Sequence, residues 1–186
     1  MGMSPRPAPD LALRRDQVIR AARDLAESGG WAGVTIRRLA GELGVTQPVL
    51  YSAFAGRQAL IDAVALNGFD DLAVALEASE ASPMARMRAY LDFAAAHPRV
   101  YEAMFSLPSG LAFAVDHTPE PLQRAFRGIR DAFPDADGTR AEVAWSAWHG
   151  LATLEASGRL RASAAQARLD LVHDMLTQHT TTRRIP

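Results

Sequence analysis

The residues best suited to chemistry lie in one short stretch, VTIRRLAGELGVTQPVLYSAF, at positions 34–54. The amide of Gln47 can pair with the edge of an adenine base, and the apolar atoms of Pro48 and Val49 can touch a thymine methyl group. The hydroxyl groups of Tyr51 and Ser52 can bind phosphate oxygens. Together these side chains could read base edges and hold the DNA backbone, provided that one helix presents them.

The residues around this set predict such a helix. Pro48 would break a helix interior, but it suits the second position of a helix capped by Thr46, where the backbone N–H has no intrahelical partner. A preceding helix over 36–43, capped by Thr35, ends at Gly44. Two short helices joined by a glycine turn predict a helix-turn-helix, whose second helix enters the major groove. The alternative is an ordinary helical corner in a globular protein.

Composition favours an all-α protein, because Ala, Leu and Arg abound while aromatic residues make up 7% of the 186 residues. The net charge is −1, yet residues 1–57 are basic and the remainder is acidic. The positive charge of residues 1–57 suggests that this segment alone binds a polyanion. Chance scatter of surface charge is the alternative explanation of the same distribution. The absence of cysteine excludes disulfides and thiolate metal sites.

The sequence shows no sign of a membrane protein. No apolar run approaches the length of a membrane-spanning helix, and the first ten residues, MGMSPRPAPD, lack the apolar centre of a signal peptide. We therefore expect a soluble, cytoplasmic protein with no membrane partner.

Residues 13–66 resemble the DNA-binding domain of the tetracycline repressor (TetR) family, and the segment QPVLY is especially similar to that of the founding repressors. The resemblance implies a three-helix head, followed by a fourth helix that begins near Arg57 and leads into a helical ligand-binding body. It also implies that Gln47, Pro48 and Val49 face bases. Thr35, Tyr51 and Arg57 would hold phosphates. The DNA-binding set that we predict is Thr35, Arg37, Thr46, Gln47, Pro48, Val49, Tyr51, Ser52 and Arg57.

One position departs from the family pattern. Ala53 stands where many relatives carry a histidine or another polar residue, so we expect no DNA contact there.

Helix breaks suggest about nine helices and four segments. The segments are a flexible arm at 1–10, a helix-turn-helix domain at 11–56, a ligand-binding and dimerisation domain at 57–180 and a frayed tail at 181–186. The helices expected beyond the head cover about 57–79, 83–97, 100–105, 121–133, 139–158 and 163–179.

A Met- and aromatic-rich set of residues in the second domain predicts an adaptable apolar pocket, with plain core packing as the alternative. The ligand-binding residues that we predict are Met87, Leu91, Tyr101, Met104, Phe105, Phe113, Trp145, Trp148 and His149.

Residues 82–180 also resemble a C-terminal domain class of the TetR family that carries a Trp-His-Gly signature, here at 148–150. Two interpretations stay open for Trp145, Trp148 and His149: they either line the ligand pocket or pack the last two helices into a dimer interface. Apolar stripes on those helices suit a four-helix dimer bundle, with Ala144, Leu151 and Leu154 on one and Leu169, Val172 and Leu176 on the other.

Nothing in the sequence predicts an enzyme. The five histidines lack metal-binding spacing, and GxSxG, P-loop and GxGxxG motifs are absent. We predict no catalytic residue, no metal and no cofactor. The function that we expect is a homodimeric bacterial repressor, released from a palindromic operator in double-stranded DNA by a small apolar ligand. The alternative is a DNA-binding regulator without a ligand, whose C-terminal domain serves only dimerisation or a protein partner.

Overall fold

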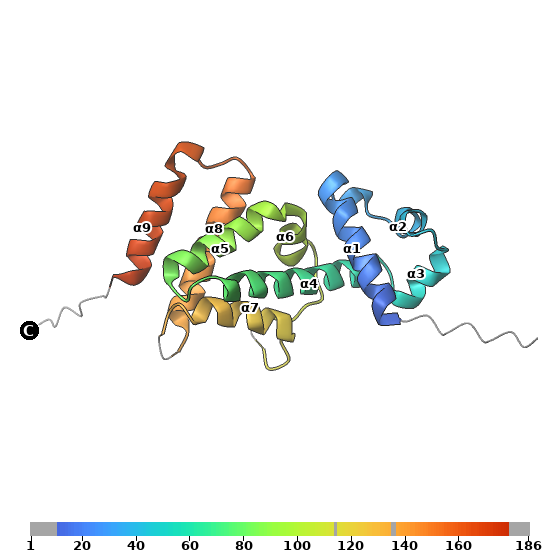
Figure 1. Cartoon of the computed structure of the whole chain (residues 1–186), viewed down its shortest axis with the longest axis horizontal. Coiled ribbons are helices and arrows are strands. Elements are labelled where there is room, and N and C mark those ends of the chain that lie inside the picture. The colour runs from blue at the N-terminus through green and yellow to red at the C-terminus, as the bar shows by residue number, and fades with distance from the viewer. Residues whose placement is uncertain (1–10, 114, 135–136, 179–186) are drawn as a thin grey trace, which may run out of the picture. The chain divides into compact units, whose positions relative to one another are not determined.

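The computed structural model describes residues 11–113, 115–134 and 137–178 (Figure 1). The arm predicted at 1–10 and the tail predicted at 181–186 lie outside the described residues. Within them the chain forms nine α-helices and two 3₁₀ turns and no strand, which confirms the all-α prediction. The described chain divides into two compact units, a head unit (11–68 and 99–111) and a body unit (69–98 and 112–178).

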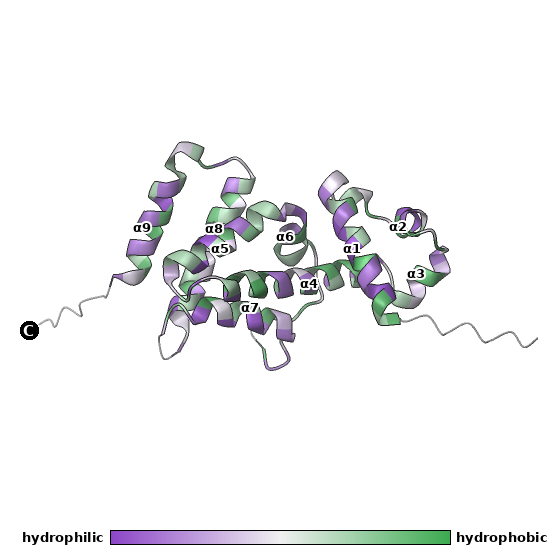
Figure 2. Ribbon diagram, viewed as in Figure 1, coloured by the Kyte–Doolittle hydropathy of each residue, from purple (hydrophilic) through white to green (hydrophobic). Residues whose placement is uncertain are grey.

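The head unit contains six elements, one of which it shares with the body unit. They are α1 (Leu11–Gly29), η1 (Trp31–Gly33), α2 (Ile36–Glu42), α3 (Gln47–Ala53), the first part of α4 (Arg57–Ala78) and α6 (Pro98–Phe105). Apolar and polar residues alternate along α1 (Figure 2). Its apolar face is buried at Val18, Ala22 and Leu25, as the spacing of these residues predicts.

The two short helices of the head begin and end close to the residues that the sequence predicts. Thr35 Oγ1 accepts the backbone N–H of Arg38 at 3.1 Å and so caps α2. Gly44 follows α2 with φ +62°, a conformation that glycine adopts without strain. Thr46 occupies the N-cap position of α3, although its side chain makes no capping hydrogen bond, and Pro48 lies in the first turn as predicted.

The body unit holds the rest of α4 together with four further helices and a 3₁₀ turn. They are α5 (Pro83–Ala96), α7 (Glu120–Arg130), α8 (Thr139–Ala156), η2 (Ala162–Ala164) and α9 (Ala165–Thr177). Helices α5, α7 and α8 pack on one another around Tyr90, Phe133 and Trp148, which are at most 2% exposed. Helix α7 also approaches α4 closely, since a Cβ at Gly128 would lie 3.0 Å from the Cβ of Leu76.

Two expectations about the body need correction. The helix expected to reach residue 133 ends at Arg130, and Phe133 lies in the turn that follows. Ala144 does not belong to a free apolar stripe, because it is 0% exposed inside the body unit. Among the described residues no helix combines the length and apolarity needed to cross a membrane.

Candidate nucleic-acid interface

Helix α3 presents polar groups on the face that the sequence predicts. Gln47, Pro48, Tyr51 and Ser52 are exposed, and Val49 is half-buried. Tyr51 is a large side chain with 55% of its surface exposed. The hydroxyl of Ser52 donates to the carbonyl of Val49 at 2.7 Å, which leaves the oxygen able to accept a further hydrogen bond. The arrangement offers hydrogen-bonding and apolar groups along one side of a short helix.

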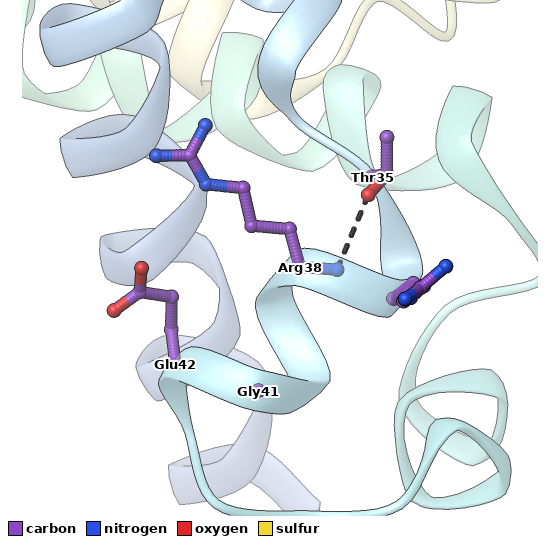
Figure 3. A pocket seen from close by; sticks show the side chains of 5 residues that line it. Thr35, Arg38, Gly41 and Glu42 are labelled. Carbon is purple, nitrogen blue, oxygen red and sulfur yellow. Dashed lines mark hydrogen bonds between the residues drawn. The ribbon is translucent and has the colours of Figure 1, made fainter.

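The N-cap residue Thr35 and helix α2 line an open hollow, shown in Figure 3. The hollow has a volume of about 660 Å³ and is lined by Thr35, Arg37, Arg38, Gly41 and Glu42. Because the hydroxyl oxygen of Thr35 already accepts the N–H of Arg38, its own O–H remains to donate to an anion. Arg37 and Arg38 are both exposed there and supply positive charge.

The DNA-binding set predicted from the sequence includes Arg37 but not Arg38. A Cβ at Gly33 would lie 3.1 Å from Nη1 of Arg38, so this guanidinium lies against the turn that precedes α2. The adjacent Arg-Arg pair in the sequence was the signal that could have found it.

Arg57 makes contacts inside the head that the sequence did not predict. Its Nη2 donates to the carbonyl of Trp31 at 2.8 Å and its Nε to that of Val34 at 3.3 Å. The side chain therefore braces the turn between α1 and α2. A guanidinium has five N–H donors, so a phosphate contact stays a prediction for the donors that remain.

Arg15 holds the far end of α3. Its Nη1 donates to the carbonyl of Ala53, and its guanidinium lies 4.3 Å from the centre of the Phe54 ring. A cation at a helix C-terminus interacts favourably with the helix dipole. Ala53 itself is buried, with 6% of its surface exposed. No local motif marks Arg15, because its partners lie 38 residues away.

The nine residues predicted to bind a ligand fall into both units. Tyr101, Met104 and Phe105 belong to α6 of the head unit, where the rings of Tyr101 and Phe105 are 4.7 Å apart. A Cβ at Gly68 would lie 2.8 Å from the sulfur of Met104, so α6 packs closely on α4. The other six lie in the body unit: Met87, Leu91, Phe113, Trp145, Trp148 and His149.

Aromatic side chains form the centre of the body unit. The Trp148 ring lies 5.9 Å from that of Tyr90 and 6.0 Å from that of Phe133. Trp145 donates its indole N–H to the hydroxyl of Tyr90 at 3.2 Å. Burial lowers the pKa of His149 below its ordinary value, which favours the neutral ring. The structure thus brings Trp145 and Trp148 together around Tyr90.

Exposed apolar side chains gather on the outer faces of α8 and α9. Val143 is 54% and Leu154 39% exposed on α8, and Leu171 is 61% and Met175 70% exposed on α9. Gly150 lies on the same face of α8 as Val143 and Leu154, and a Cβ added to it would meet no atom within 4 Å. Such faces are typical of helices that pack against a second chain.

Comparison with known proteins agrees with this architecture. Residues 84–179 match the family described as "Tetracyclin repressor-like, C-terminal domain", and residues 18–64 match "Bacterial regulatory proteins, tetR family". Over 53 residues the chain is 51% identical to the class C tetracycline repressor protein of Escherichia coli. That match covers 28% of this chain and 24% of the repressor, so the chain spans about a quarter of this curated relative.

Solved structures extend the likeness over nearly the whole chain. A protein of unknown function from Rhodococcus sp. RHA1 is 29% identical, with a TM-score of 0.68 over 94% of this chain and 97% of that one. A TetR variant from Acinetobacter baumannii AYE, solved in complex with minocycline, has a TM-score of 0.59 at 18% identity, over 86% of this chain and 91% of that one. The first of the two family matches alone covers more than half of the sequence. The chain therefore belongs to the TetR family of DNA-binding bacterial transcriptional regulators.

Proposed function

We propose that the chain forms a homodimer that binds a palindromic operator through α2 and α3 and represses transcription until a small apolar ligand enters the body unit. The observation that carries the proposal is the exposed face of α3, which offers Gln47, Pro48 and Tyr51, while both arginines of α2 are exposed as well. Gln47 would read a base edge, while Tyr51, Thr35 and Arg37 would hold phosphates. The place of action would be the cytoplasm, where bacterial DNA lies.

Dimerisation would use the outer faces of α8 and α9. A monomer would leave Val143, Leu171 and Met175 in water, each more than half exposed. A two-fold axis would bury the same face of both chains and place two α3 helices about one DNA turn apart, roughly 34 Å. A palindromic operator matches that symmetry.

Ligand response is the further part of the proposal. It is supported by the fold shared with the TetR variant solved with minocycline and by the aromatic centre of the body unit. A ligand shifts the protein between operator-bound and released states only through its differential affinity for them. A shift from almost fully bound to almost fully released needs about 5.5 kcal/mol of such differential affinity.

A regulator without a ligand is the second candidate. The observation in its favour is the tight packing of the predicted pocket, where Met87 is 1% and Trp148 0% exposed. Such a body could serve dimerisation alone.

Operator binding in the presence of small molecules separates the two candidates. Fluorescence anisotropy with a selected operator duplex should show release by at least one compound of an apolar library. Trp148→Phe should alter that release while keeping operator binding, whereas Trp148→Ala would remove a fully buried side chain and cost about 3–5 kcal/mol of stability. If no compound changes operator affinity, the ligand-free regulator replaces the ligand-responsive one.

A further inference from the structure

The body unit buries a positive charge that has no hydrogen-bonded partner. Arg86, on α5, is 5% exposed, and it is the one charged side chain that is buried among the described residues. Its Nε and Nη1 are enclosed and form no hydrogen bond. Proteins rarely bury a guanidinium without a partner, because the free energy lost when the charge leaves water is then not offset by an ion pair or hydrogen bonds.

The position of Arg86 on its helix adds to the positive potential. Helix α5 begins at Pro83 after the N-cap Ser82, whose hydroxyl accepts the N–H of Ala85 at 3.4 Å. Arg86 follows in the first turn, where the helix dipole is positive and favours an anion over a cation. The backbone N–H of Arg86 donates to the carbonyl of Ser82 at 3.0 Å, so it is the guanidinium that lacks a hydrogen-bonded partner.

Glu77, an acidic group that feels the charge of Arg86, is already engaged. Glu77 accepts Nε of Arg124 at 2.7 Å and Nη2 of the same residue at 2.5 Å, in bidentate geometry. The hydrogen bond from Arg124 is the largest cause of the lowered pKa of Glu77, and the charges of Arg127 and Arg86 lower it less. Arg124 also faces Asp70 at 3.6 Å, and Arg127 pairs with Glu120 at 3.0 Å. These exposed pairs leave no carboxylate hydrogen-bonded to Arg86.

A second unpartnered donor lies in the same helical core. The indole Nε1 of Trp148 is buried and has no hydrogen-bond partner. Tyr90 follows Arg86 by one helical turn on the same face of α5, and its ring packs on Trp148. The surroundings are apolar, with Met87 and Phe133 at most 2% exposed. Two orphan donors among apolar side chains suit a ligand with an acidic end and an apolar body.

We propose that the body unit binds an apolar molecule bearing a carboxylate, with Arg86 pairing with the carboxylate and Trp148 contributing its N–H or its ring. The inference rests on the proposed ligand response, whose ligand class it names. Entry of the ligand requires the core to repack, and Met87, a flexible thioether next to Arg86, is the side chain best able to move. Planar pairing of guanidinium and carboxylate supplies orientation as well as attraction.

The test compares acids with their neutral counterparts on the full chain. Straight-chain monocarboxylates from butanoate to dodecanoate, and the matching primary amides, are titrated while the melting temperature is followed. We expect at least one acid to bind about 10- to 100-fold more tightly than its amide, the range set by hydrogen bonds to a charged group. Equal stabilisation by every acid and its amide, or by none of them, overturns the inference without any variant.

Two variants test whether Arg86 is the residue that causes the preference for acids over amides. Arg86→Met should bring the acid-to-amide ratio to about one, and it should not lower the melting temperature of the free protein, because an unpaired buried charge is replaced by an apolar chain of similar length. Arg88→Met is the matched control, since Arg88 is exposed on the same helix and donates to Gln166 at 3.2 Å. It should keep the wild-type ratio. If Arg86→Met keeps the wild-type acid-to-amide ratio, the inference is wrong. If Arg86→Met does not fold, Arg86→Lys serves instead. It keeps the positive charge but loses the planar guanidinium, so it should still lower the acid-to-amide ratio.

Operator binding in the same samples separates this inference from the proposed function. If amides release the operator as well as acids do, ligand response stands and the carboxylate site falls. If an acid binds through Arg86 yet leaves operator affinity unchanged, the carboxylate site stands and ligand-driven release falls.

Discussion

The carboxylate of Glu27, on α1, accepts the backbone N–H of Arg99 at 3.1 Å, and the same oxygen accepts that of Val100 at 3.2 Å. These N–H groups open α6 and have no partner within their own helix. Nearby, the indole N–H of Trp31 donates to the carbonyl of Arg99 at 2.7 Å. The start of α6 is therefore attached to α1 and η1, and residues 99–111 belong to the head unit.

Removal of this cap should loosen α6. Glu27→Ala leaves two helix-terminal N–H groups to water and removes a negative charge from a helix N-terminus, so we expect a loss of about 0.5–1 kcal/mol in the free energy of unfolding. Urea denaturation measures it. Glu27→Gln keeps an acceptor and should lose less. Equal stability of Glu27→Ala and the wild type would show that the cap contributes nothing.

Local signals in the sequence predicted most of the head. Thr35, Gly44 and Pro48 each act within a few residues, and a helix start or stop depends on just such short-range chemistry. The cap of α2, the start of α3 after Thr46 and the exposed face of α3 followed from them, although the Thr46 side chain makes no capping hydrogen bond. The contacts of Glu27 with α6 could not be predicted in this way, because 72 and 73 residues separate the partners and neither end carries a distinctive motif.

Gln47 should contribute to sequence preference. Gln47→Ala should cost about 1–3 kcal/mol on the cognate operator and almost nothing on random DNA, because a base edge is read by specific hydrogen bonds. Tyr51→Phe should weaken both complexes alike, since a phosphate contact carries no sequence information. Competition binding with operator variants checks both. An unchanged preference in Gln47→Ala would move the recognition surface away from α3.

Arg57 needs two measurements because it braces the head and is predicted to hold a phosphate. Arg57→Ala removes hydrogen bonds to the carbonyls of Trp31 and Val34, so it should lower stability by about 1–2 kcal/mol. If the remaining N–H donors bind DNA, the salt dependence of binding should also fall by about one unit of slope. Lost stability with an unchanged slope would leave Arg57 as a brace alone.

The outer face of α8 should hold the dimer. Gly150→Glu adds a side chain where the protomer leaves open space, so the monomer should tolerate it and even gain helix propensity. At a two-fold seam the same change inserts a charge among apolar side chains, and light scattering should report half the mass. Operator affinity should fall with it. Gly150→Ala is the smaller control, and a Gly150→Glu variant that stays dimeric would place the interface elsewhere.

The state of His149 should make stability depend on pH. Burial lowers its pKa in the folded chain, so the unfolded chain takes up the proton first as the pH falls. Stability contributed by the neutral ring is present above the unfolded pKa and is lost on acidification, roughly between pH 7 and 5. His149→Gln should reduce the pH dependence of the free energy of unfolding in this range. Each protein is compared with its own stability near pH 8. If stability falls with pH in the variant as it does in the wild type, His149 does not cause the pH dependence.

Two features of the body exceeded what residue types can predict. A charged residue such as Arg86 is expected at the surface, and only the packing of α5 on its neighbours shows it to be buried. The spacing of Ala144 places it on the predicted outer stripe of α8, yet it lies inside the body unit. The sequence could not distinguish the two positions, because a small residue fits equally well in a core and at an interface. Which side of a helix faces inward depends on the helices that pack against it, and the sequence of that helix alone does not identify them.

Selection of duplexes from a random DNA library with the purified full chain tests whether a dimer of this chain reads its operator through α3. We expect enrichment of inverted repeats whose half-sites lie about one helical turn apart, roughly 10 base pairs, and loss of that enrichment in Gln47→Ala. Failure to enrich any sequence, or enrichment of sites without two-fold symmetry, would contradict a dimeric regulator that reads its operator through α3.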